Sequence, residues 1–334
     1  MSDNTAFAFQ EDSTTLSTML EEMSRVIVGQ DAMTRSLVLG LLTGGHVLLE
    51  GLPGLAKTLA VKTLATILDA KFSRIQFTPD LLPSDLIGTT IYRPETHEFV
   101  PKKGPIFANI VLADEINRAP AKVQSALLEA MAERQVTLAD KTYLLEEPFL
   151  VLATQNPIEN EGTYNLPEAQ LDRFMFKTRV TYPNRTEERQ VLELMGTGHA
   201  PETRQVFSTQ GILRMRQHLD SVYMDDRIKE YIVRLVTATR PGEVIEPNET
   251  TGSGLNDIRR FVQVGASPRA TLFLAKSARA NAFLENLNFV TPDDVKIVAP
   301  DILRHRLILT FEAEAKKVST DDVTAQLLKT IVIP

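Results

Sequence analysis

One short run of residues could bind phosphate. Gly51-Leu52-Pro53-Gly54-Leu55-Ala56-Lys57-Thr58 lies between an apolar segment and a segment with helical periodicity. Backbone N–H groups at the start of a helix point toward an anion, and the helix dipole favours negative charge there. Lys57 can bind the outer phosphates of a nucleotide, and the Thr58 hydroxyl can bind Mg²⁺. The run is therefore typical of a phosphate-binding loop.

Position 56 departs from the strict pattern of such loops, which has glycine there. If this position needs a positive φ, Ala56 costs about 1 kcal/mol; if the position is already helical, alanine costs nothing. Taken alone, the run is interpreted equally well as a turn that leads into a helix.

Two further segments place polar residues after an apolar run. Residues 109–113 are followed by Asp114 and Glu115, and residues 149–154 are followed by Asn156. Neighbouring carboxylates repel each other unless a cation lies between them. We expect Asp114 to hold Mg²⁺ and Glu115 to orient and deprotonate an attacking water. Asn156 could bind the γ-phosphate or position that water, although solvated acids and an Asn-Pro turn are the plainer alternatives.

The elements that must position these residues alternate between strands and helices. Five apolar runs have the length of buried strands, which predicts a parallel sheet covered by helices on both faces. Two further segments predict small inserted hairpins. The strands are expected at 46–50, 72–78, 108–113, 149–154 and 174–182, the helices between them at 57–68 and 121–134, and the hairpins within 89–105 and 134–148.

The chain of 334 residues is long enough for about two domains. Residues 1–15 are polar and are expected to form a flexible arm. Residues 16–183 should form the α/β domain. Residues 184–334 contain no further strand pattern and are expected to be all-α, with helices at 226–239 and 267–284.

Composition excludes several classes of protein. The chain has 36 basic and 43 acidic residues, so its net charge of −7 argues against a nucleic-acid partner. It contains no cysteine, which excludes disulfides, thiolate zinc sites and cysteine nucleophiles. None of the five histidines stands in a metal-ligand spacing. No signal peptide or membrane-spanning run is visible, so a cytoplasmic location is expected.

Taken together, the motifs resemble those of the MoxR family of AAA+ ATPases, over nearly the whole chain from about residue 16. The resemblance implies an α/β fold, an αβα nucleotide-binding domain with strand order 5-1-4-3-2 followed by a helical lid. The stretches that carry it are VIVGQ (26–30), GLPGLAKT (51–58), ADEINRAPAKVQSALLEAMAERQVT (113–137), ATQNP (153–157), LPEAQLDRFMF (166–176) and SPRA (267–270).

The resemblance also implies a role for each motif residue. Lys57 and Thr58 match the Walker A motif, which binds the phosphates. Alanine is usual at position 56 in this family. Asp114 and Glu115 match Walker B, and Asn156 matches sensor 1. The remaining nucleotide contacts are Val28, Gly29 and Gln30 beside the adenine, and Pro53, Gly54, Leu55, Ala56, Lys57, Thr58 and Leu59 in the loop and the following helix.

Three arginines have two alternative roles or a role outside the strand ends. Arg173 in LDRF matches an arginine finger that reaches a neighbour's ATP, although a surface ion pair with Asp172 is the alternative, worth at most about 1 kcal/mol. Arg269 in SPRA matches sensor 2 on the lid. A cation is disfavoured in the first turn of a helix, which suggests that a phosphate lies nearby. Arg118 is either a subunit-interface contact or a surface charge.

The implied function is Mg²⁺-dependent ATP hydrolysis that drives chaperone-like remodelling of a client protein. A finger acting in trans implies a ring, most simply a hexamer, and the resemblance implies a von Willebrand A-domain partner. A magnesium-chelatase-like motor subunit, a nucleic-acid motor and a switch that only binds nucleotide are the alternatives.

Overall fold

The computed structural model describes residues 3–157, 163–196, 201, 203–243, 250 and 258–334. The chain forms two compact units. One contains residues 15–215, and the other contains residues 1–14 together with residues 216–334.

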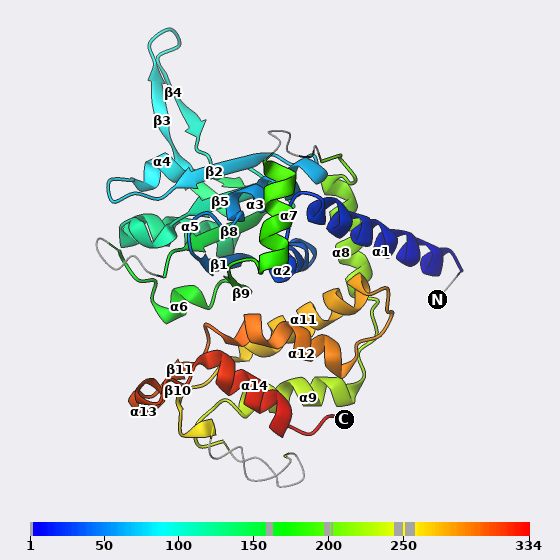
Figure 1. Cartoon of the computed structure of the whole chain (residues 1–334). Coiled ribbons are helices and arrows are strands. Elements are labelled where there is room, and N and C mark those ends of the chain that lie inside the picture. The colour runs from blue at the N-terminus through cyan, green and yellow to red at the C-terminus, as the bar shows by residue number, and fades with distance from the viewer. Residues whose placement is uncertain (1–2, 158–162, 197–200, 202, 244–249, 251–257) are drawn as a thin grey trace. The chain divides into compact units, whose positions relative to one another are not determined.

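A parallel five-stranded sheet forms the centre of the unit of residues 15–215 (Figure 1). Its strands lie in the order β2-β5-β8-β1-β9, and every neighbouring pair is parallel. Counted along the chain, this is the order 5-1-4-3-2 that the family resemblance implies. The strands are β1 (Val47–Gly51), β2 (Phe72–Gln76), β5 (Ile110–Asp114), β8 (Leu150–Gln155) and β9 (Phe176–Val180).

Both faces of this sheet are covered by helices, as its continuous apolar strands require. Leu48, Val111 and Val151 point to one face, where they join a core cluster with Val123 and Leu127 of α5 (Ala121–Glu133). Helix α2 (Asp31–Thr43) contacts β1 and β9, and helix α3 (Lys57–Ile67) contacts β5. Neither helix contributes a residue to this cluster. The packed sheet therefore fixes the carboxyl ends of its strands relative to one another.

The two inserted hairpins expected from the sequence are present. The first consists of β3 (Gly88–Arg93) and β4 (Glu98–Lys103), which follow the short helix α4 (Pro83–Ile87). Figure 1 shows this hairpin extending away from the sheet. The second consists of β6 (Gln135–Leu138) and β7 (Lys141–Leu144), after α5.

The boundary expected at residues 183 and 184 falls later, because the segment after β9 stays with the sheet unit. This segment forms α7 (Arg185–Met195). The N–H groups of Val206 and Phe207 then donate to the Ile67 carbonyl at the end of α3, at 3.0 and 3.1 Å. The division between the units lies within α8 (Thr209–Leu219).

The flexible arm that the polar composition of residues 1–15 predicted is not present in the described residues from 3 onward. From Asp3 onward they are part of α1 (Asp3–Ser24). Ser13 is fully buried, and its hydroxyl donates to the Phe283 carbonyl at 2.9 Å. Asp12 and His218 lie 2.6 Å apart between Oδ2 and Nδ1. Contacts with the unit of residues 216–334, distant in sequence, therefore order this segment.

The unit of residues 216–334 is mainly helical, as expected for a lid. It also contains a two-stranded antiparallel ribbon, β10 (Val262–Val264) with β11 (Ile308–Leu309), which the sequence pattern did not predict because the strands are too short to show alternation. Its helices are α9 (Asp226–Thr237), α11 (Pro268–Leu284), α12 (Pro292–Leu303), α13 (Phe311–Ala315) and α14 (Thr320–Thr330).

Among the helices of the described part of the chain, none combines the length and the apolar character needed to cross a bilayer.

Candidate active site

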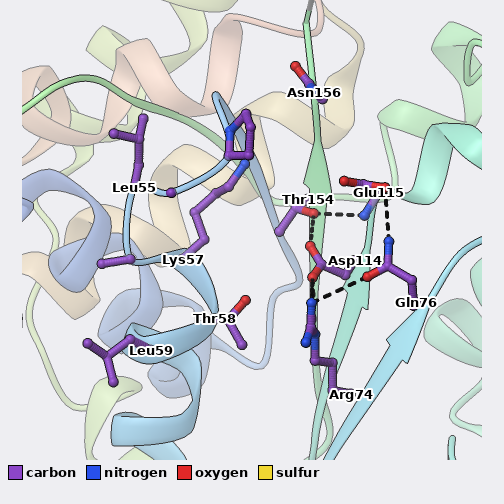
Figure 2. Close-up of a pocket in the computed structure, with 13 residues that line it drawn as sticks. Leu55, Lys57, Thr58, Leu59, Arg74, Gln76, Asp114, Glu115, Thr154 and Asn156 are labelled. Carbon is purple, nitrogen blue, oxygen red and sulfur yellow. Dashed lines mark hydrogen bonds and ion pairs between the residues drawn. The ribbon is translucent and has the colours of Figure 1, made fainter. Parts of the chain in front are cut away.

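A cavity of about 410 Å³ lies at the carboxyl ends of β1, β5 and β8. It collects most of the residues that the sequence identified, from three separate parts of the chain (Figure 2). Its lining consists of Pro53, Gly54, Leu55, Ala56, Lys57, Thr58, Leu59, Arg74, Gln76, Asp114, Glu115, Thr154 and Asn156.

The loop from β1 to α3 needs glycine at two positions, for different reasons. A Cβ on Gly51 would lie 2.5 Å from the Val180 carbonyl oxygen of β9. Gly54 has φ +83, in the left-handed region that favours glycine. Ala56 also has a left-handed backbone, with φ 57 and ψ 14, so its methyl group carries a strain of about 1–2 kcal/mol.

Helix α3 begins directly after Ala56, which supplies no side-chain hydrogen bond to the first turn. The first backbone N–H groups of a helix have no acceptor within the helix. At this end of the helix they can bind the oxygens of a phosphate. The strained loop therefore places an anion-binding helix end against the cavity.

Lys57 brings a positive charge to the same place. Its Nζ donates to the Gly51 carbonyl at 2.6 Å, which holds the side chain along the loop. Burial lowers the pKa of the Lys57 ammonium below its ordinary value, while the charges of Asp114 and Glu115 act in the opposite direction. The carboxylates therefore help keep a partly buried lysine in its charged form.

Thr154 connects the Asp114 carboxylate to the backbone of Glu115. Its hydroxyl donates to Asp114 Oδ1 at 2.6 Å and accepts from the Glu115 N–H at 2.8 Å. Glu115 has φ 56, an uncommon conformation for a residue other than glycine and one that clusters at functional sites. The bonds to Thr154 stabilise this turn of the chain directly after β5.

Two side chains of β2 donate hydrogen bonds to the carboxylates of Asp114 and Glu115 (Figure 2). Arg74 donates to Asp114 Oδ2 from both Nε, at 3.1 Å, and Nη2, at 2.6 Å. Gln76 donates from Nε2 to Glu115 Oε2 at 2.9 Å. Arg118 also approaches this Glu115 oxygen, at 3.3 Å.

The oxygen atoms around the cavity suit Mg²⁺. Thr58 offers a hydroxyl and Asp114 a carboxylate, and Mg²⁺ is usually bound by one or two such ligands together with phosphate oxygens. Among the described residues, no group of three or more acidic or histidine side chains could hold a metal by itself. The donor set therefore fits a metal that is held jointly with a nucleotide.

Two of the expected site residues lie elsewhere. Arg173 is exposed, does not line the cavity, and donates from Nη1 to the Leu128 carbonyl of α5 at 2.9 Å. Arg269 is exposed in the first turn of α11, in the other compact unit. Their roles as finger and sensor remain predictions.

Residues 28–30 are likewise outside the cavity lining. Gln30 is buried, and its side chain donates to the Thr181 carbonyl just after β9, at 2.9 Å. Gly29 has φ +69, and a Cβ there would lie 2.5 Å from Glu187 Oε2. These residues tie the chain before α2 to the segment after β9, and their contact with adenine remains a prediction.

Sequence reasoning missed Arg74, Gln76 and the bridging role of Thr154. One signal was available for the first two. Residues two apart on a strand share a face, so polar side chains at 74 and 76 in a predicted buried strand point to a polar neighbour. The neighbour depends on strand order, and the parallel register that sets Gln76 beside Asp114 is not visible in the sequence.

Comparison with known proteins agrees with this fold and site. A family model described as ATPase family associated with various cellular activities (AAA) matches residues 46–176, and one for the AAA lid domain matches residues 256–327. Chaperone MoxR1 of Mycobacterium tuberculosis is 49% identical over 96% of this chain and 82% of its own. Protein MoxR of Methylorubrum extorquens is 30% identical over 94% of this chain and 93% of its own.

A crystal structure extends the similarity to three dimensions. It is that of a candidate ATPase from Cytophaga hutchinsonii, which superposes with a TM-score of 0.89 and is 46% identical over 99% of this chain and 98% of its own. The fold and the site thus define a nucleotide-binding protein of the AAA+ ATPase class. Within that class, the chain belongs to the MoxR family.

Proposed function

We propose that this chain hydrolyses ATP with Mg²⁺ in the cavity at the carboxyl ends of β1, β5 and β8. The observation that carries the proposal is the convergence of Lys57, Asp114 and Glu115 on one cavity at a helix start. A cation and uncapped N–H groups suit the phosphates, and the carboxylates suit a metal and an attacking water.

Each residue then has a defined task. The N–H groups of the first turn of α3 and the Lys57 ammonium bind the phosphate oxygens and stabilise the charge that develops during transfer. Thr58 and Asp114 would hold Mg²⁺, which neutralises charge between the phosphates when bound. Glu115 orients the attacking water and accepts its proton, and Asn156 positions the γ-phosphate or that water.

Replacement of the proposed base tests this assignment. In Glu115→Gln we expect ATP hydrolysis to fall by about 100-fold or more, because the amide cannot accept the proton, while ATP binding is retained. Hydrolysis would be measured as released phosphate with Mg²⁺ and with EDTA, and binding with a fluorescent ATP analogue.

Glu133→Gln is the matched control, because Glu133 is an exposed residue at the end of α5. It should hydrolyse ATP at the wild-type rate. Equal rates in Glu115→Gln and Glu133→Gln, or a wild-type rate in EDTA, would contradict the proposal.

We further propose that hydrolysis drives the remodelling of a client protein, with a second protein bearing a von Willebrand A domain as partner. The relative named as a chaperone supports the first part, and the family resemblance stated above supports the second. The exposed Arg173, outside its own chain's cavity, supports a ring in which it reaches a neighbour's nucleotide; a hexamer is the expected form.

A further inference from the structure

Arg74 and Asp114 both line the cavity, and the guanidinium binds the carboxylate there. Its guanidinium donates twice to Oδ2, at 3.1 and 2.6 Å, and its Nη2 also donates to Gln76 Oε1 at 3.3 Å. The Asp114 side chain is only 13% exposed, whereas that of Arg74 is 50% exposed. The arginine therefore reaches the carboxylate from the open side and has room to leave it.

The second oxygen of Asp114 also has a partner, since Oδ1 accepts the Thr154 hydroxyl at 2.6 Å. The Thr154 hydroxyl is fixed in turn by the Glu115 N–H. A divalent cation that binds Asp114 therefore meets a carboxylate whose Oδ2 accepts two guanidinium N–H groups. Two cations at one carboxylate repel each other, so each weakens the binding of the other.

We propose that Arg74 is a positioning residue that competes with divalent metal for Asp114, so that metal binds tightly only together with nucleotide. This inference rests on the proposed function, which makes Asp114 a metal ligand. Nucleotide phosphates reverse the competition in two ways. They add metal ligands that the protein lacks, and they add negative charge that a displaced guanidinium can bind.

The competition predicts how the chain binds metal without nucleotide. Removal of the guanidinium in Arg74→Met frees Oδ2, and the carboxylate then attracts a cation without a rival. Groups that touch a metal ligand alter metal affinity by about 10- to 100-fold, and here we expect a gain of about tenfold. The probe is Mn²⁺ alone, titrated into nucleotide-free chain and followed by the electron paramagnetic resonance signal of the free ion.

Arg179→Met is the matched control. Arg179 lies on β9 of the same sheet, is 47% exposed, and faces Glu50 at 3.6 Å instead of Asp114. Arg179→Met changes the net charge of the chain by the same amount as Arg74→Met. A gain in Mn²⁺ affinity caused only by lost positive charge would therefore appear in both variants. The double variant Arg74→Met with Asp114→Asn should lose the gain, because the freed carboxylate is absent.

The outcomes separate this inference from the proposed function. Equal Mn²⁺ affinity in wild-type chain, Arg74→Met and Arg179→Met would overturn the role of Arg74, even if Glu115→Gln has lost hydrolysis. Weaker binding of metal-free ATP by Arg74→Met, with unchanged Mn²⁺ affinity, would overturn it too and make Arg74 a phosphate contact.

Unimpaired hydrolysis by Asp114→Asn would instead refute the proposed function. If Arg74→Met does not fold, Arg74→Gln decides the question, because it also removes the guanidinium but keeps a polar side chain.

Discussion

At the scale of single residues, Ala56 is where the loop carries a visible conformational cost. Its left-handed backbone is the conformation that glycine adopts freely, and α3 begins at the next residue. In Ala56→Gly the relief of about 1–2 kcal/mol of strain opposes about 0.4–1 kcal/mol of added chain entropy in the unfolded state. We expect the free energy of unfolding to be unchanged or to rise by up to about 1.6 kcal/mol, measured by urea denaturation.

Ala132→Gly shows what the same exchange does at an ordinary helical position. Ala132 is exposed within α5, where glycine should lower stability by about 0.5–1 kcal/mol. If both variants lost the same stability, the left-handed strain at position 56 would be refuted.

The residues that could be predicted from the sequence are those whose partners are close in the chain. Lys57 and Thr58 belong to one loop, and Asp114 and Glu115 to one strand end, so their local pattern is sufficient. Arg74 could not be assigned, because its partner Asp114 is 40 residues away and the contact depends on which strands pair.

At the scale of elements, the strands were predictable because each contains a short apolar run. Strands β1, β5 and β8 are buried along most of their length, whereas β2, at the edge of the sheet, is mostly half-buried or exposed. The first part of the N-terminal helix α1, before residue 15, was missed for the opposite reason. Its order depends on contacts such as that of Ser13 with the Phe283 carbonyl, 270 residues away, which no local pattern reveals. The ribbon of β10 and β11 is equally short of local signal, since its strands have three and two residues.

The packing of α2 on β1 positions the strand that leads into the phosphate-binding loop. Gly40 in α2 allows this close approach, because a Cβ there would lie 2.7 Å from Val47 Cγ2 of β1. Alanine usually stabilises a helix by about 1 kcal/mol relative to glycine. In Gly40→Ala we expect the opposite, a loss of about 1–3 kcal/mol from overpacking, measured by urea denaturation.

The same exchange in a Val47→Ala background separates the clash from any other effect. Without Cγ2 the nearest atom to the added methyl group is the Gly45 carbonyl oxygen, at 3.1 Å. The loss should therefore shrink by about 1 kcal/mol or more without disappearing, as the two sites are in contact. An equal loss from Gly40→Ala in both backgrounds would show that α2 and β1 do not press together at this point.

At the scale of the whole molecule, the chain divides into a sheet unit and a helical unit, and the division does not follow the end of the sheet. The segment after β9 remains with residues 15–215, while α1 contributes its first residues to the other unit. The strand pattern ends near residue 184 and so suggested a boundary there. The actual division depends on hydrogen bonds such as those to the Ile67 carbonyl, which connect segments far apart in the sequence.

The assembly of several chains is the largest-scale property that the site predicts. Lys57 and Glu115 line the cavity of their own chain, but Arg173 does not, and its bond to the Leu128 carbonyl holds it against α5. If Arg173 acts on a neighbour's nucleotide, mixing two inactive variants should restore hydrolysis. An active site then takes Glu115 from an Arg173→Ala chain and Arg173 from a neighbouring Glu115→Gln chain.

A random one-to-one ring of these variants has both groups at about a quarter of its sites, so about a quarter of the wild-type rate should return. Phosphate release per chain would be measured over a wide range of protein concentration, where wild-type activity should also rise as rings form. The double variant gives the control, because mixing it with either single variant creates no site that has both groups. No recovery in the first mixture despite assembly would contradict a site shared between chains. Recovery in the control mixtures would show that hydrolysis does not need both groups.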